Sequence, residues 1–200
     1  MKFLDALLGR TKPKQPDLNA LFAVTGAAVT LQASVGLRSS GQAAVAFKPA
    51  SGQGFAATSD ELLELARYSG KASGTDLQTV DDEYGYRWIV LEDPDLEDLV
   101  TTVHLVNAGL TEQGFGSQLL CSVFGFAAEN DGAACHLVYL YKRGTFYPFA
   151  PRPGQRRDNE LELRLRGAAD AELPVEPDLA RWFPLWGLPL DGGTGSGHEH

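Results

Sequence analysis

Residues 119–149 constrain the fold more than any other part of the chain. They contain three apolar runs with the composition and alternation of β-strands, at residues 119–127, 135–141 and 145–149. Asp131-Gly132, a strong hairpin signal, lies between the first two runs, and a tight turn at Arg143-Gly144 joins the last two. Because short turns join antiparallel neighbours, the sequence predicts three consecutive antiparallel strands here.

The rest of the chain predicts further strands and helices. Strands are expected at residues 29–37, 43–48, 55–57, 77–80 and 84–91, with a turn at 39–42. Helices are expected at residues 2–9, at 18–24, from a capping box at Thr58, at 94–112 and from 177 onwards. Residues 158–166 alternate like a strand but have the composition of a helix, and we favour the helix.

These elements follow the order βββ-α-ββ-α-βββ-α. Consecutive hairpins separated by helices are typical of an α+β fold. We therefore predict one twisted antiparallel sheet with helices packed mainly on one face. Residues 1–16 form a basic arm, residues 17–190 a single domain, and residues 191–200 a disordered tail.

The arm is positively charged, unlike the chain as a whole. Four cations against Asp5 give it a charge of +3, so the net charge of −9 leaves −12 for the remainder. The apolar residues of positions 2–9 lie on one helical face, which suits an anionic membrane surface or the protein's own core. The candidate membrane-binding residues are Lys2, Phe3, Leu4, Leu7, Leu8, Arg10, Lys12 and Lys14.

The sequence contains no recognisable catalytic, cofactor or metal constellation. It has no nucleophile elbow, and no glycine loop at a strand-to-helix turn that would cradle a phosphate. Cys135 and His136 are adjacent, so in a strand they point to opposite faces and cannot share a metal. We expect Cys121 and Cys135 to be small buried hydrophobes, with facing positions across a hairpin as an alternative. The acidic body disfavours nucleic acid.

The clearest candidate for a binding surface is a basic and aromatic block at residues 141–157. It contains five cations and no acid, and arginine and aromatic residues are enriched at interface hot spots. A second aromatic cluster at 182–186 is either a lid over one sheet face or an exposed anchor. The candidate partner-binding residues are Lys142, Arg143, Phe146, Tyr147, Phe149, Arg152, Arg156, Arg157, Trp182 and Trp186. The alternative is that these aromatic residues belong to the core.

Several segments in order resemble the PspAB family of PspA-associated proteins from actinobacteria. They are FLDALLGRTKP at the start, DEYGYRW, LLCSVFGF, LVYLYKRGTFYPFAP and, near the end, LPVEPDLARWFPLWG. The resemblance implies a link to the phage-shock, or envelope-stress, system built on the membrane-binding protein PspA, a long helical coiled coil. It implies no catalytic residue. The order of elements is also similar to YbjN-type and secretion chaperone-like domains, which bind protein segments.

Three functional hypotheses follow. The first is a non-catalytic accessory or regulatory protein that binds a protein partner, PspA being the candidate, in the cytoplasm. The second is a peripheral protein of the inner membrane face that binds weakly to anionic lipid through the N-terminal helix. The third, ranked below both, is an enzyme with an unrecognised site. Homo-oligomerisation stays open.

Overall fold

The computed structural model describes residues 17–50, 60–61, 63–68, 70–71, 74–128 and 134–190. Several predictions fall outside these residues. They are the N-terminal helix and arm, the strand at 55–57, the capping box at Thr58, the Asp131-Gly132 turn and the C-terminal tail.

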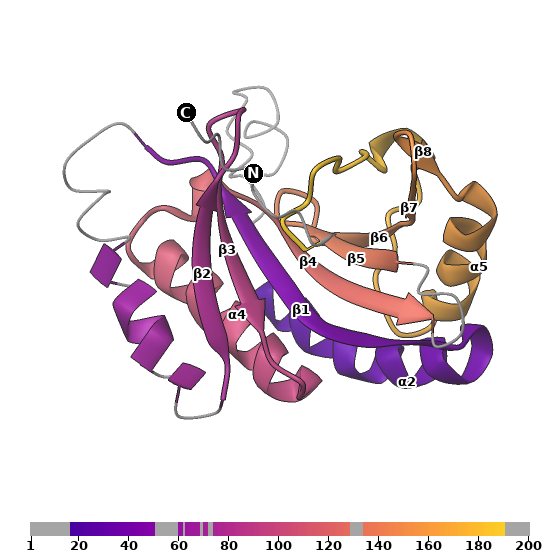
Figure 1. The fold of residues 1–200 in the computed structure, drawn as a ribbon, viewed down its shortest axis with the longest axis horizontal. Helices are drawn as coiled ribbons and strands as arrows, with labels where there is room; N and C mark the ends of the chain where they lie inside the picture. Colours follow the sequence, from indigo (N-terminus) through magenta and orange to yellow (C-terminus); the bar gives the residue numbers. More distant parts are fainter. Residues whose placement is uncertain are drawn as a thin grey trace, which may run out of the picture.

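A six-stranded antiparallel sheet organises the described chain (Figure 1). Its strands are β1 (Leu37–Phe47), β2 (Asp76–Asp81), β3 (Arg87–Glu92), β4 (Leu119–Ala128), β5 (Ala134–Leu140) and β6 (Thr145–Phe149). They lie in the order β2-β3-β1-β4-β5-β6, and every neighbouring pair is antiparallel. A small hairpin of β7 (Pro151–Arg152) and β8 (Arg156–Arg157) follows. The predicted α+β class and the three consecutive strands are confirmed.

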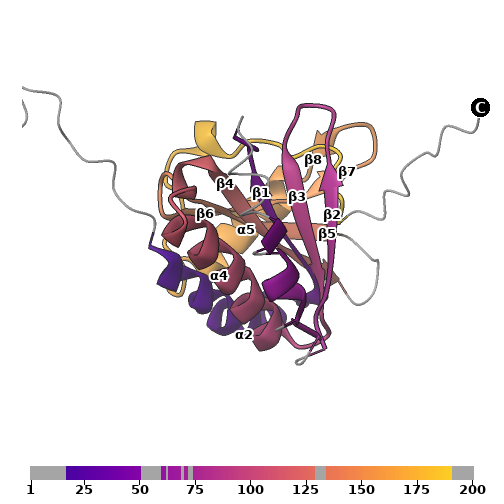
Figure 2. The same cartoon turned by 90° about the vertical axis from the view of Figure 1, so that its left-hand side faces the viewer.

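The helices pack on one face of this sheet (Figure 2). They are η1 (Leu18–Phe22), α2 (Ala23–Val35), α4 (Leu96–Glu112), η2 (Gly116–Gln118) and α5 (Asn159–Ala169), with helical residues also at 60–61, 63–68 and 70–71. Of these named helices, η2 alone has no buried residue. A short helix near the C-terminus, η3 (Leu179–Arg181), does not belong to this layer. The helices predicted at 94–112 and 158–166 are confirmed by α4 and α5.

The strand predicted at 29–37 is wrong, because most of this segment belongs to α2. Val24, Ala27 and Leu31 are its buried positions, spaced three and four residues apart as on one helical face. The residues that suggested alternation include Val29, whose side chain is 71% exposed. Alanine favours the helix, and Gly36, with φ of 74°, ends it.

The turn predicted at 39–42 is also wrong, because these residues continue β1. The pairing of β1 with β4 shifts between Ser39 and Ala43, so three residues of β1 lie opposite Gly125 alone. Gly41, with φ of 74°, makes this bulge possible. The residues that suggested a turn therefore form a β-bulge within one long strand.

Alternating side chains divide the sheet into two faces, each with its own core. The helices cover one face, where Val45, Phe124 and Tyr139 are completely buried. On the opposite face Trp88, Val123 and Tyr147 belong to a second, smaller core. Cys121 lies on this second face and Cys135 on the first, so the two thiols do not face each other.

The second face is covered by irregular chain rather than by a helix layer. Residues 174–190, here called the C-terminal strap, bring Trp182, Leu188 and Leu190 onto it. The strap begins beside β6, where residue 175 forms a parallel bridge to Phe146. In Figure 1 its yellow trace lies over the β4–β6 half of the sheet. Since the strap does not cover the whole face, part of the sheet remains open beside it.

Candidate functional site

An apolar groove lies where the strap leaves the second sheet face uncovered. Its volume is about 450 Å³, and we call it the sheet-face groove. The floor and walls are formed by Ala46, Tyr86, Trp88, Leu120, Cys121, Leu140, Lys142, Arg143, Tyr147, Arg181, Phe183 and Leu185. Five neighbouring strands, from β3 to β6, contribute to it, which at the usual strand spacing gives a length of about 19 Å. Such a surface is suited to hold apolar side chains of a partner.

Cations border this groove on a protein whose net charge is −9. Lys142 is exposed and, within the described residues, has no ion-pair partner. Arg143 and Arg181 also line the groove, each paired with an acid of the strap, Glu176 and Asp178. At one edge the Lys48 ammonium lies 5.4 Å from the centre of the Tyr86 ring. Two of these four cations thus face acids of the strap, and Lys142 and Lys48 are the border cations that stand outside these ion pairs.

A buried carboxylate fastens the strap to the sheet. The Glu176 side chain is fully buried and accepts hydrogen bonds from Arg143 at 3.0 and 3.3 Å. Thr145 Oγ1 donates to it at 2.9 Å, and the backbone N–H of Asp178 at 3.2 Å. A bidentate arginine with two further donors satisfies the carboxylate in place of water. Arg143 thus both lines the groove and holds the strap.

Two further hydrogen bonds hold the strap to the rest of the domain through its backbone carbonyls, from Tyr147 and Arg157, and a third, from Trp182, lies within the strap. The Tyr147 hydroxyl donates to Phe183 at 2.9 Å, and the Trp182 indole N–H donates to Glu176 at 3.0 Å. The Arg157 guanidinium donates to the carbonyl of Trp182. Much of the basic and aromatic block therefore binds a later segment of its own chain.

The predicted partner-binding aromatic residues lie mainly inside the protein. Phe146 is buried in the helix-side core, and Phe149 is buried against Trp186, with 5.1 Å between the ring centres and an edge-to-face arrangement. Trp182 is 5% exposed and Trp186 is half-buried. Tyr147 is buried but still lines the groove. The lid interpretation of the C-terminal aromatic cluster thus describes the observed packing.

The predicted arginines of residues 152–157 form a separate depression of about 330 Å³ at the β7–β8 hairpin. Arg152 is paired with Asp158 at 2.8 Å, and Arg157 with the buried Glu162 at 2.9 Å. Arg156 is exposed, and its Nε donates to the carbonyl of Pro153. The structure therefore separates these three arginines from the groove.

Most of the groove was not among the predicted site residues. Tyr86, Trp88, Leu120, Leu140 and Phe183 come from four segments that only the sheet brings together. The available signal was alternation, because Tyr86 and Trp88 share one side of their strand and Leu140 and Lys142 one side of theirs. Combined with the order of the strands in the sheet, this alternation would have placed the two pairs of residues on the same sheet face.

The described residues contain no group of three or more histidine, cysteine or acidic side chains that could hold a metal ion. Burial raises the pKa of the Cys121 thiol to about 12. Burial likewise raises the pKa of Cys135, with a smaller contribution from the charge of Glu162. Both thiols are therefore protonated at neutral pH and poorly reactive.

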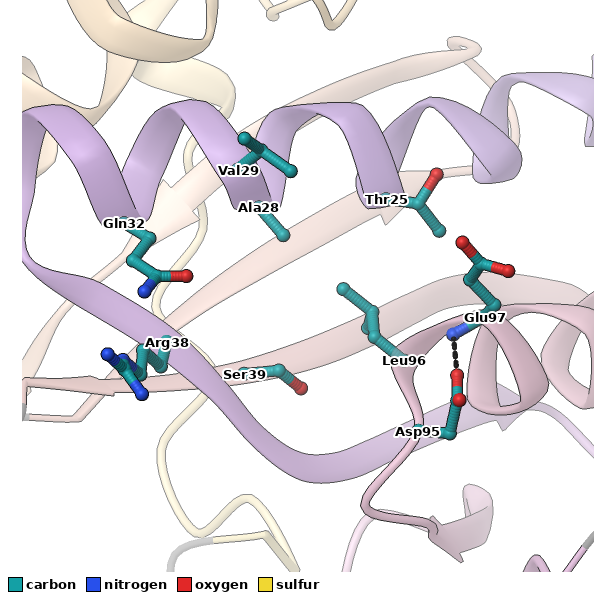
Figure 3. Close-up of a pocket in the computed structure, with 9 residues that line it drawn as sticks. All are labelled: Thr25, Ala28, Val29, Gln32, Arg38, Ser39, Asp95, Leu96 and Glu97. Carbon is teal, nitrogen blue, oxygen red and sulfur yellow. Dashed lines mark hydrogen bonds between the residues drawn. The ribbon is translucent and has the colours of Figure 1, made fainter.

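A second large depression lies between α2, the start of β1 and the start of α4 (Figure 3). Its volume is about 470 Å³ and its lining is mixed, with Leu96 beside Arg38 and Glu97. The first backbone N–H groups of α4 already bond to the Asp95 carboxylate, at 2.8 Å for Glu97. These backbone donors are therefore occupied, and the lining contains acids as well as Arg38, so the arrangement does not favour binding of an anion.

Residues Leu18–Val35 are long and apolar enough to cross a membrane, judged by length and composition alone. No charged residue occurs in this stretch. In the fold it is η1 followed by α2, and Leu21, Val24, Ala27 and Leu31 are buried against the sheet and α4. Packing in the core thus accounts in part for the apolar composition of this stretch.

The strap attachment should weaken in acid. Burial raises the pKa of the Glu176 carboxyl, but the bonds from Arg143, Thr145 and Asp178 outweigh this and hold it below its usual 4.5. A carboxyl with a lowered pKa stabilises the fold above about pH 4.5 and loses this contribution as pH falls through the folded-state value. We expect the unfolding free energy to fall below pH 4.5, and to fall less in Glu176→Gln, as measured by urea unfolding across the pH range. Equal pH dependence in both proteins would contradict this assignment.

Comparisons with known proteins agree with the sequence resemblance. No curated protein and no solved structure matches the chain at a significant level. The family model described as PspAB, PspA associated protein B, matches residues 1–190. The matched region includes every residue that lines the sheet-face groove. Since the matched region is nearly the full sequence, the chain belongs to the PspAB family of PspA-associated proteins.

Proposed function

We propose that this protein is a non-catalytic accessory protein that binds PspA through the sheet-face groove in an envelope-stress response. The observation that carries the proposal is an open apolar groove with a cationic border on an acidic protein. The family description supplies the partner, since it names an association with PspA. The groove would bind the partner by direct contact and would not catalyse a reaction.

The groove dimensions suit an amphipathic helix of the partner. At a rise of 1.5 Å per residue, a length of about 19 Å accepts about 13 helical residues. Such a helix satisfies its own backbone and buries only the stripe that faces the groove. Acidic residues beside that stripe would meet Lys142 and the partly exposed Arg143 and Arg181. A segment with apolar residues flanked by acids is therefore the expected ligand.

Phe183 provides the sharpest test of the apolar contact. Its side chain lines the groove and is 56% exposed, whereas the bond that holds the strap uses its backbone carbonyl. We expect Phe183→Ala to weaken PspA binding about tenfold or more, the usual loss for an aromatic anchor, while the fold is kept. Calorimetric titration of PspA into the purified protein would measure this. Leu179→Ala, on the same strap but outside the groove lining, should bind like the wild type.

Lys142 tests the charge of the border separately. We expect Lys142→Glu to weaken PspA binding about five- to tenfold at low salt, because it replaces attraction to acids by repulsion. Raising the salt concentration should reduce the difference from wild type. Arg156→Glu is the matched control, since it makes the same charge change on an exposed cation away from the groove. If both substitutions act equally, net charge and not the groove governs binding.

A further inference from the structure

Two arginines that line the sheet-face groove are paired with acids of the C-terminal strap in different ways. Arg143 binds Glu176 through Nε and one Nη nitrogen, at 3.0 and 3.3 Å, and the Glu176 side chain is fully buried. Arg181 binds Asp178 through Nε alone, at 3.0 Å, and the two side chains are 46% and 50% exposed. The second pair is therefore the one in which water or another carboxylate can readily replace the acid.

The strap can stay in place when Arg181 leaves Asp178. Release of Arg143 would leave the Glu176 carboxylate buried without its bidentate partner, which is strongly unfavourable. Asp178, in contrast, would keep access to water. One of its oxygens also accepts a hydrogen bond from the backbone N–H of Ala180 at 3.1 Å, as the N-cap of η3, and this bond does not involve the arginine. The pair of Arg181 and Asp178 is thus separate from the attachment of the strap.

The Arg181 guanidinium has donors available for a second carboxylate. Among the described residues, the bond from Nε to Asp178 is the one hydrogen bond that its side chain makes. Its two Nη nitrogens carry four further N–H groups, and a guanidinium binds a carboxylate best through two parallel bonds. Arg181 lines the groove together with Lys142 and Phe183. A carboxylate on a ligand in the groove can therefore make a bidentate contact that Asp178 does not make.

We propose that Arg181 determines the preference of the groove for acidic ligands, and that Asp178 competes with the carboxylate of the ligand for it. A glutamate beside the apolar stripe of a bound helix takes the place of Asp178 on the guanidinium. A glutamine does not, because a neutral amide binds a guanidinium more weakly than a carboxylate does. The strap thus carries both the cation that recognises the acid and the acid that restrains this cation. This inference rests on the proposed function, which assigns the groove to an amphipathic helix of a protein partner.

Two stapled synthetic helices of about 13 residues test this exchange on the full chain. Both have leucines along one stripe, and beside it one has glutamates and the other glutamines. Calorimetric titration gives the ratio of the two affinities. We expect Asp178→Asn to raise the preference for the glutamate helix about two- to fivefold, and Arg181→Gln to lower it by a similar factor, as for exposed ion pairs. The glutamine helix should bind all variants alike, since asparagine is an equally good N-cap. Asp170→Asn makes the same charge change on an exposed residue at the end of α5 and should leave the ratio unchanged.

The double variant separates exchange from simple repulsion. In an Arg181→Gln background, Asp178→Asn should raise the ratio by a clearly smaller factor than in the wild type, because no guanidinium is left to release. An equal rise in both backgrounds would overturn the proposal, and so would an unchanged ratio in either single variant or a wild type that does not bind the glutamate helix. PspA is not used in these titrations. If the synthetic helices behave as expected and PspA does not bind, only the choice of PspA as the partner is rejected.

Discussion

Trp182→Ala should lower the unfolding free energy by about 3–5 kcal/mol, the usual loss for a buried tryptophan. The side chain is 5% exposed in the second core, beside the Tyr147 ring at 6.4 Å between ring centres. The substitution also removes the indole bond to the carbonyl of Glu176. For a chain of this size we expect the Tm to fall by about 10 °C. Urea unfolding and a thermal melt measure the two quantities.

Leu179→Ala is the control for this substitution. Leu179 belongs to the same strap, but its side chain is 50% exposed, so its replacement should change the unfolding free energy by about 0.5 kcal/mol or less. We also expect Trp182→Ala, unlike Leu179→Ala, to bind a hydrophobic dye, because a loosened strap uncovers the apolar sheet face. If the two variants are equally stable, the strap does not contribute to the core as described.

Arg143→Met should cost about 2 kcal/mol of unfolding free energy. It leaves the buried Glu176 carboxylate without its bidentate partner, which in a fully buried pair costs about 3–5 kcal/mol. We expect less here because the Arg143 side chain is 42% exposed and water partly replaces it. Urea unfolding gives the loss. A double-mutant cycle with Glu176→Gln should show that the effects of the two substitutions are not additive.

Arg156→Met provides the comparison for Arg143. Both residues belong to the basic and aromatic block, but Arg156 lies on the surface and its Nε donates to the nearby carbonyl of Pro153. Its substitution should leave the unfolding free energy within about 0.5 kcal/mol of the wild type. An equal loss in both variants would mean that general charge, and not the bond to Glu176, is responsible.

The sequence predicted the elements whose local signals agree with their packing. In α4, the apolar residues recur on one helical face and Asp95 caps the first turn, so local preference and burial indicate the same structure. The apolar strands from residue 119 onwards also pair as expected, β4 with β5 and β5 with β6. In both cases contacts within about twenty residues decide the structure.

The incorrect elements are those that distant contacts decide. The segment 29–35 alternates like a strand, yet Ala27 and Leu31 are buried on the helix face because α2 packs on β1 and α5. The prediction of the candidate site residues was incorrect in part for the same reason. Tyr147 and Arg143 have the composition of a binding surface, but the groups that they bind, at Phe183 and Glu176, lie more than thirty residues later. Composition alone does not reveal that such a partner belongs to the same chain.

The position of the strap also has a consequence for synthesis. The face that it closes is formed by β1, β3, β4, β5 and β6, all of which leave the ribosome before residues 174–190 do. The helix-side core can assemble earlier, because most of its residues precede the strap. A nascent chain therefore passes through a stage in which one side of the sheet is packed and the other still exposes Trp88, Val123 and Tyr147. Chaperones that bind apolar strands should contact the new protein mainly during that interval.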